Sequence, residues 1–207
     1  MSSSSDAMRA RSVPVKNFDE VVGLIREQID EGKQDPAIHR AVSGILSRKV
    51  GDGWAIEPKD HDAEVRAIFD YVRRNVRYQH DTHGIDTFRS PRRTLELRAG
   101  DCDDMTILIG SLAGAAGYPV KVKVVDTSGG GYDHVYPLVG VPPTKPTRWV
   151  ALDATEPHAV GWEVPRNRVH GHRTYALDGV SRLAAAPAWA WVAVLIGIVG
   201  LLRIVRG

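Results

Sequence analysis

One apolar helix pattern, followed immediately by alternating strand patterns, constrains the fold of this chain more than any other feature. From residue 103 to residue 116 apolar side chains recur at helical intervals, and Gly117 with Pro119 ends the pattern. From Val120 onward valines alternate with lysines, as in a half-buried strand. Two more strand patterns follow, "HVYPLVGV" and "RWVALDA", separated by the turn-rich "PPTKPT". We therefore expect a buried helix packed on an antiparallel sheet.

Three amphipathic helix patterns precede this unit. Asn17 is a suitable N-cap for the first, Pro36 begins the second, and Asp60 is a suitable N-cap for the third. Residues 77–100 have the composition of a long loop, with a short helix after Pro91. Helices followed by a run of antiparallel strands are typical of the α+β class.

The chain divides into five predicted segments with different compositions. The N-terminal segment is polar and lacks the apolar stretch of a secretory signal. In chain order we expect a flexible N-terminus (1–16), a helical extension (17–58), a core domain (59–165), a linker (166–182) and a hydrophobic helix (183–205).

The last of these segments has the pattern of a membrane anchor. Residues 183–202 carry no charge, lie between Arg182 and Arg203, and at about 1.5 Å per residue extend roughly 30 Å, the thickness of a bilayer core. Trp189 and Trp191 suit the membrane interface, and the upstream excess of arginine predicts a main domain on the cytoplasmic face. The alternative is a helix buried in a hydrophobic partner, in a homo-oligomer or in a virion assembly.

Charge and cysteine content narrow the classes of function. The chain has 27 basic and 25 acidic residues and a net charge of +2, which gives no electrostatic basis for nucleic-acid binding. Cys102 is the only cysteine, so no internal disulfide can form and a reducing compartment is expected. Its free thiol therefore requires an explanation.

Cys102 is either a buried structural residue or a nucleophile. A nucleophilic thiol requires a lowered pKa, a base, and a group that orients the base. Cys102 lies where the helix begins, so the helix dipole favours its thiolate, whereas the acids beside it raise the pKa. We expect Asp103 and Asp104 to be first-turn residues whose carboxylates point away from the sulfur.

A base and an orienting carboxylate are available on the strands. His134 begins the second strand pattern and Asp153 ends the third, so antiparallel pairing would place the two side chains next to each other. Asp153 would then fix the tautomer of His134, and His134 would pair with Cys102. A lone histidine at a strand edge is also a common surface residue.

Three blocks in this order resemble the transglutaminase-like superfamily of cysteine proteases and acyl transferases. They are "RSPRRTLELRAGDCDDMTILIGSLAGAAGYPVKVKVV", "DHVYPLV" and "RWVALDAT". The resemblance covers roughly residues 60 to 165 and is to bacterial or phage members in particular. It implies a papain-like α+β fold and a catalytic triad of Cys102, His134 and Asp153.

The resemblance also implies an activity. We expect a cysteine-dependent hydrolase that cleaves a peptide or isopeptide amide of a protein or peptide substrate through an acyl-thioester on Cys102. The alternatives are an acyl-transfer enzyme that cross-links amines, and a non-enzymatic assembly component of a phage virion or membrane complex. No cofactor and no metal are expected, since the acidic and histidine-containing stretch 80–86 is more typical of a polar loop.

The sequence gives weaker signals for the oxyanion hole and for the substrate cleft. Relatives commonly complete the oxyanion hole with a side chain upstream of the cysteine. In this sequence Glu96 lies six residues before Cys102, but an ionised glutamate cannot donate a hydrogen bond. Backbone N–H groups, or Tyr78, are left for this role. Candidate residues for lining the cleft are Trp54, Phe88, Tyr132 and Trp162.

Overall fold

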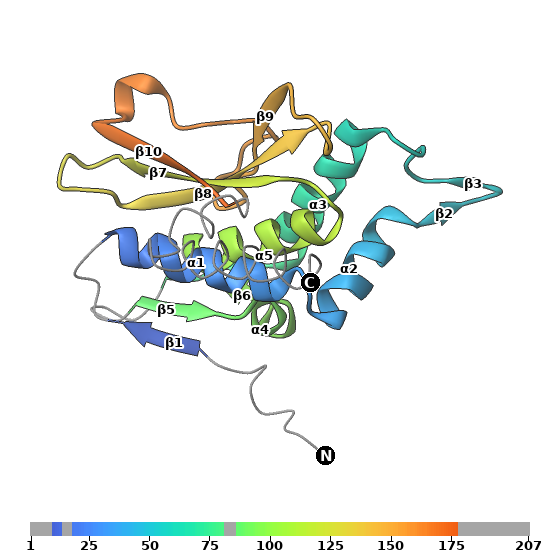
Figure 1. Cartoon of the computed structure of the whole chain (residues 1–207), viewed down its shortest axis with the longest axis horizontal. Helices are drawn as coiled ribbons and strands as arrows, with labels where there is room; N and C mark the ends of the chain where they lie inside the picture. Colours follow the sequence, from blue (N-terminus) through green and yellow to red (C-terminus); the bar gives the residue numbers. More distant parts are fainter. Residues whose placement is uncertain (1–9, 14–17, 81–85, 178–207) are drawn as a thin grey trace, which may run out of the picture. The chain divides into compact units, whose positions relative to one another are not determined.

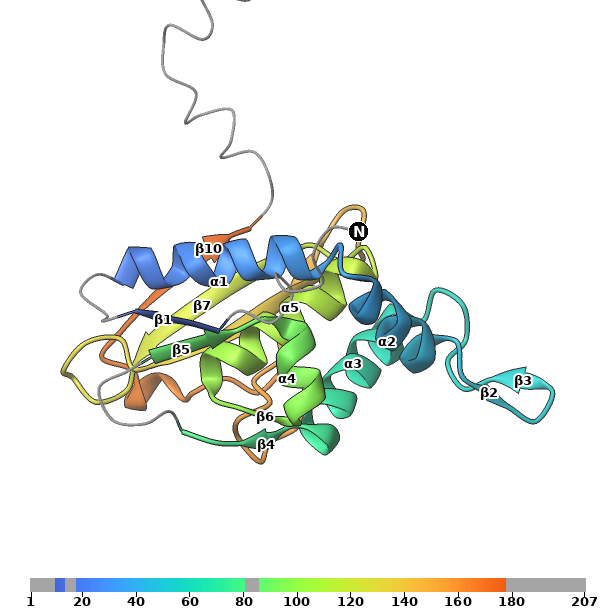
Figure 2. The same cartoon turned by 90° about the horizontal axis from the view of Figure 1, so that it is seen from below.

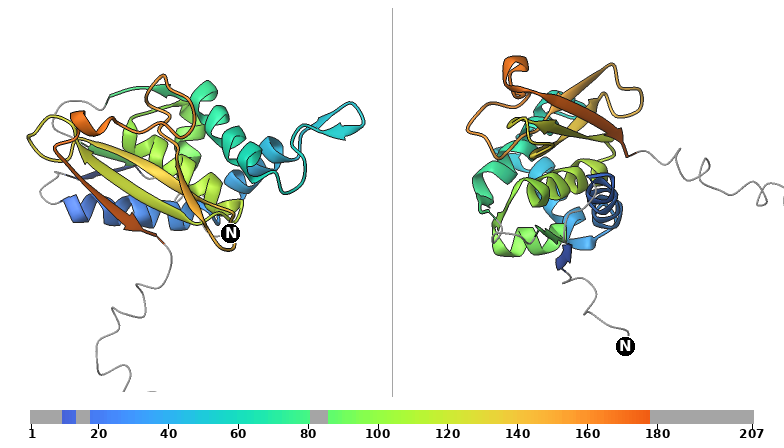
Figure 3. Two further views of the ribbon diagram at one scale, coloured as in Figure 1. Left: turned by 90° about the horizontal axis from the view of Figure 1, so that it is seen from above. Right: turned by 90° about the vertical axis from the view of Figure 1, so that its left-hand side faces the viewer.

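The structure of the protein is a computed structural model that describes residues 10–13, 18–80 and 86–177. Within these residues the largest sheet has the strand order β10-β7-β8-β9, and each neighbouring pair is antiparallel. This sheet forms one layer and the helices form a second layer against it (Figures 1 and 3). The predicted α+β class is confirmed. The helices are α1 (Phe18–Gly32), α2 (Pro36–Leu46), α3 (His61–Asn75), α4 (Pro91–Leu97) and α5 (Cys102–Ala115).

The four strands of the main sheet occur where the periodicity changes from helical to alternating. They are β7 (Val120–Asp126), β8 (His134–Val141), β9 (Arg148–Ala151) and β10 (Gly171–Ala176). Short strands pair outside this sheet: β1 (Ala10–Val13) with β5 (Asp86–Arg89), β2 (Lys49–Val50) with β3 (Gly53–Trp54), and β4 (Arg77–Tyr78) with β6 (Ala99–Gly100).

The buried helix expected from residues 103–116 is α5. Asp101 caps it by accepting a hydrogen bond from the Asp104 N–H at 3.1 Å. Every residue from Asp104 to Ala113 is buried, because α5 packs between α1 and β8 with α3 and α4 also against it. A helix that is apolar around most of its circumference is buried in the interior of a domain. α5 therefore forms the centre of the core.

The sheet has two differently covered faces. The face toward α5 carries the alternating valines of the strand patterns, among them Val122, Val124 and Val139, which are fully buried. The other face carries a smaller apolar cluster made of Val125, Tyr136, Leu138 and Ala151, with Trp149 and Val164 at its margin.

The predicted helical extension belongs to the same core. Ile25 and Ile29 of α1 are fully buried, and α1 lies along α5 (Figure 2). At Gly110 of α5 an added Cβ would lie 2.5 Å from the Ile29 Cδ1 atom, so the two helices approach closely. Asp60 caps α3 as predicted, accepting the Ala63 N–H at 3.0 Å.

Three features depart from the sequence-based expectation. The predicted loop 77–100 contains β4, β5 and β6 besides α4, and the predicted linker contains β10. The third strand ends at Ala151, before Asp153. Strands of two residues have no periodicity to detect, and β10 is a largely exposed edge strand without an apolar alternation.

The predicted terminal segments lie mostly outside the described residues. Residues 10–13 of the expected flexible N-terminus form β1, while the anchor predicted at 183–205 falls beyond the described ranges. Among the helices from Phe18 to Ala115, none is both long enough and apolar enough to cross a membrane. Membrane attachment stays a prediction.

Candidate active site

The site begins where the chain enters α5. Gly100 lies so close to Asp104 that an added Cβ would be 2.6 Å from the Asp104 Cβ atom. Asp104 is fully buried, accepts the Arg89 N–H at 2.8 Å and forms an ion pair with the Arg89 guanidinium. Its carboxylate is thus directed to β5 and away from Cys102, as predicted. Arg89 was not singled out from the sequence, which contains no local signal for a partner fifteen residues away.

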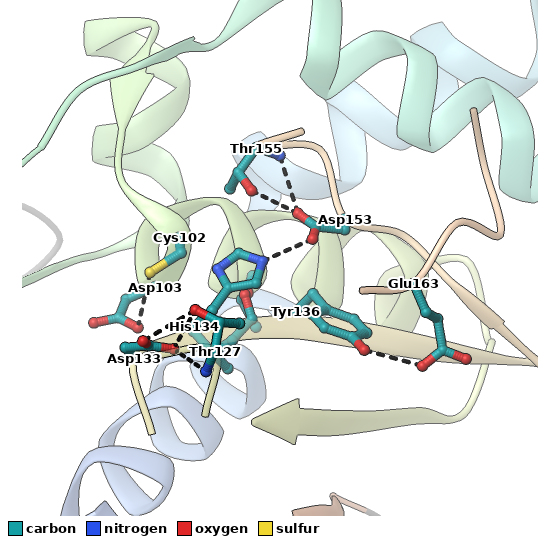
Figure 4. A network of polar contacts seen from close by, with 11 residues as sticks. Cys102, Asp103, Thr127, Asp133, His134, Tyr136, Asp153, Thr155 and Glu163 are labelled. Carbon is teal, nitrogen blue, oxygen red and sulfur yellow. Dashed lines mark hydrogen bonds and ion pairs between the residues drawn. The ribbon is translucent and has the colours of Figure 1, made fainter. Parts of the chain in front are cut away.

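The expectation for Asp103 is wrong. Its carboxylate accepts a hydrogen bond from the Cys102 thiol, with 3.9 Å between Sγ and Oδ1 (Figure 4). Burial raises the pKa of Cys102 well above its ordinary value, and the charges of Asp103 and Asp101 raise it further. Backbone hydrogen bonds from Val135 and Asp103 lower the pKa but are outweighed. The lowered pKa expected from the helix dipole is therefore absent, and the resting thiol is protonated.

His134 and Asp153 lie next to each other, as the antiparallel arrangement predicts. The register of β8 and β9 pairs Leu138 with Ala151, and the Leu152 N–H continues the pairing to the Pro137 carbonyl at 3.0 Å. Beyond this point His134 Nε2 lies 2.7 Å from Asp153 Oδ2. The Asp153 side chain is only 1% exposed, so its charge requires partners.

Thr155 supplies those further partners. Its N–H and its hydroxyl donate to Asp153 Oδ1 at 3.2 and 2.6 Å, while Oδ2 remains directed to His134. Thr155 is not among the residues predicted for the site. The signal was a short turn in "DAT", where a threonine two residues after an aspartate can bond back to it.

The three predicted residues are brought together from three separate parts of the chain. Figure 4 shows Nδ1 of His134, the ring nitrogen not bonded to Asp153, on the side of Cys102. α5 is joined to β8 one residue after His134, because Thr106 Oγ1 donates to the Val135 carbonyl at 3.1 Å. This bond ties the helix that carries the thiol to the strand that carries the imidazole.

Tyr78 lies near the thiol, whereas Glu96 does not belong to the site. The parallel pairing of β4 with β6 places Tyr78 opposite Gly100, two residues before Cys102. Burial, and then the charge of Cys102, raise the pKa of Tyr78 to about 12. Its hydroxyl therefore stays a hydrogen-bond donor at neutral pH. Glu96 is exposed on α4 and pairs with Arg93.

The prediction that Phe88 lines the cleft is wrong, because Phe88 is fully buried in the core. Trp54 lies on the exposed β2–β3 hairpin, and Trp162 stacks on His158 with ring centroids 4.1 Å apart. Tyr132 precedes His134 by two residues. Most of the polar loop predicted at 80–86 lies outside the described residues.

Solved structures that are similar to this chain include two candidate proteases. A candidate cysteine protease from Cytophaga hutchinsonii is 18% identical, with a TM-score of 0.43 over 79% of this chain and 54% of that one. A candidate protease from Parabacteroides distasonis is 12% identical, with a TM-score of 0.45 over 78% of this chain and 36% of that one. The chain thus spans about half or less of the length of these two structures. No curated protein matches it.

The family of this chain follows from its match to the sequence model of a protein family. The model of the transglutaminase-like superfamily matches residues 46–154, more than half of the chain. This range contains Cys102, His134 and Asp153, and with them α3 to β9. The chain belongs to the transglutaminase-like superfamily.

Proposed function

We propose that the protein is a cysteine-dependent hydrolase that cleaves a peptide or isopeptide amide through an acyl-thioester on Cys102. The observation that carries the proposal is the arrangement of the imidazole. His134 Nε2 is bonded to a buried carboxylate at 2.7 Å, and Nδ1 lies on the side of the thiol (Figure 4). Membership of the transglutaminase-like superfamily supports the same assignment.

The first half-reaction starts from a protonated thiol. Because Nε2 donates to Asp153, Nδ1 holds the free lone pair and accepts the Cys102 proton as sulfur attacks the amide carbon. The new C–S bond moves the carbonyl electron pair onto oxygen. The imidazolium then protonates the leaving nitrogen, the C–N bond breaks, and an acyl-thioester and an amine result. Asp153 stabilises the transient positive charge on His134.

Water completes the second half-reaction. His134 accepts a proton from water as the water oxygen attacks the thioester carbon, and the proton returns to sulfur as the C–S bond breaks. The products are a carboxylic acid and the free thiol. A primary amine in place of water would give cross-linking through the same groups. We assign to the Tyr78 hydroxyl and to backbone N–H groups at the start of α5 the role of hydrogen-bond donors to the oxyanion in both half-reactions.

The test is labelling of Cys102 by a peptide-linked electrophile, together with hydrolysis of a mixed fluorogenic peptide library. The wild-type protein should be labelled at Cys102, and His134→Ala should reduce hydrolysis about 10²- to 10⁴-fold, the usual contribution of a general base. The control is His39→Ala, since His39 is exposed on α2. Labelling that is equal in the wild-type protein and in His134→Ala would contradict the proposal.

A further inference from the structure

The segment that follows β9 holds β8 at two positions. Near its start Asp153 bonds to His134 at 2.7 Å, and near its end Glu163 Oε2 accepts a hydrogen bond from the Tyr136 hydroxyl at 2.9 Å (Figure 4). His134 and Tyr136 are two residues apart on one strand, so their side chains leave the same face. The Gly161 N–H fastens the segment between these points to the Ala151 carbonyl at 2.8 Å.

The rings of His134 and Tyr136 are in contact. Their centroids are 5.7 Å apart and their planes are inclined by 41°, within the range of favourable aromatic pairs. Tyr136 is only 1% exposed, so its ring has little freedom to move. The bond to Asp153 fixes one atom of the imidazole, and the ring contact restricts the tilt of the imidazole about that bond.

Glu163 holds Tyr136 in turn. Burial alone would raise the pKa of Glu163, but hydrogen bonds from Lys123 and Tyr136 outweigh burial and lower it. Glu163 is therefore a carboxylate at neutral pH, and the Tyr136 hydroxyl donates to a charged acceptor, which is a stronger bond than one between neutral groups. The ion pair with Lys123 of β7 anchors the carboxylate to the sheet.

We propose that Tyr136, oriented by Glu163, is a positioning residue for His134: its ring contact directs Nδ1 toward Cys102 and stabilises the imidazolium. This inference rests on the proposed function. A ring next to a cation attracts it through its quadrupole. Among the described residues, the other titratable side chains that Figure 4 draws around His134 are Cys102 and Asp103 from α5 and Asp153 from the segment after β9. The neighbouring Asp133 is bonded to Thr127 instead.

The test compares Tyr136→Leu, Tyr136→Phe and Glu163→Gln with the wild-type protein. Tyr136→Leu removes the ring, and we expect the protonation constant of His134, measured by NMR titration of the imidazole, to fall about threefold. The rate of Cys102 alkylation at about pH 7 should fall by a similar factor. Tyr136→Phe keeps the ring but loses its bond to Glu163, and Glu163→Gln replaces the charged acceptor by a neutral one, so both variants should give an intermediate loss.

The matched control is Tyr118→Phe. Tyr118 is likewise a buried tyrosine whose hydroxyl donates to a glutamate, Glu64, but it lies at the other end of α5. Wild-type values in a folded Tyr136→Leu protein would overturn the proposal. If that variant does not fold, wild-type values in both Tyr136→Phe and Glu163→Gln would overturn it. If the wild-type protein hydrolyses no peptide of the library, the proposed function fails, while the His134 titration still decides the role of Tyr136.

Discussion

Asp103 and Asp104 are adjacent in the first turn of α5, yet their carboxylates have different partners. One contacts the Cys102 sulfur and the other is buried against Arg89. Successive residues of an α-helix point about 100° apart, so neighbouring acids reach different surroundings. The consequence is chemical, because a carboxylate next to a thiol disfavours the thiolate.

We expect Asp103→Asn to lower the pKa of Cys102, since the substitution removes one of the charges that raise it. The pH midpoint of the alkylation rate measures this pKa and should move to lower pH. Glu96→Gln is the control, because Glu96 is an exposed acid paired with Arg93, and its midpoint should equal that of the wild-type protein. A midpoint that is unchanged or higher in Asp103→Asn would rule out this role of Asp103.

β5 and α5 are joined by the buried pair of Arg89 and Asp104. The Asp104 side chain is fully buried, so its charge is compensated by Arg89 rather than by water. Since α5 begins at Cys102, this pair also holds the end of the helix that carries the thiol. The connection between two elements therefore determines the position of the candidate nucleophile.

Breaking this connection should destabilise the protein. We expect Asp104→Asn to lower the free energy of unfolding by about 3–5 kcal/mol, because it removes the buried, charged partner of the half-buried Arg89. Urea denaturation measures the change. Asp70→Asn is the matched control, since Asp70 pairs with Arg74 on the exposed face of α3 and should cost less than about 1 kcal/mol. Equal costs for the two variants would show that the buried pair is not important for stability.

The longer elements could be predicted and the shorter ones could not. α3 and α5 have apolar patterns at helical spacing within their own sequence, and the N-cap predicted at Asp60 forms. β10 has polar, exposed residues and exists because β7 offers it a hydrogen-bonding edge. A strand of this kind is stabilised by its partner and not by its own pattern.

Stability of the whole molecule should depend on acidic pH through two carboxyl groups. Glu163 joins the segment after β9 to β7 and β8, and Asp133 closes the β7–β8 loop on Thr127. Hydrogen bonds outweigh burial and lower the pKa of Glu163 from 4.5 and of Asp133 from 3.8. A lowered folded-state pKa contributes stability above the ordinary pKa, and this is lost as pH falls through the folded-state pKa. Unfolding free energy should therefore decrease as the pH falls below 4.5.

The measurement is urea denaturation at a series of pH values from about pH 7 to about pH 3. Glu163→Gln should be less stable than the wild-type protein at neutral pH and should lose less stability on acidification. Glu96→Gln is again the control and should keep the wild-type slope. A Glu163→Gln slope as steep as that of the wild-type protein would mean that this carboxyl does not contribute to acid sensitivity.

Residues close in sequence were enough to predict the α+β order of elements and the N-cap at Asp60. The triad of Cys102, His134 and Asp153 also needed the family resemblance and stays a prediction. Periodicity and capping depend on neighbours within a few positions, and His134 and Asp153 meet because one short turn joins their antiparallel strands. The partner of Asp104, the support of Asp153 by Thr155 and the contact of Tyr136 with His134 emerged only from the folded chain. So did the raised pKa of Cys102. These features depend on burial and on the directions of side chains, which exist only after the helices and the sheet have packed together.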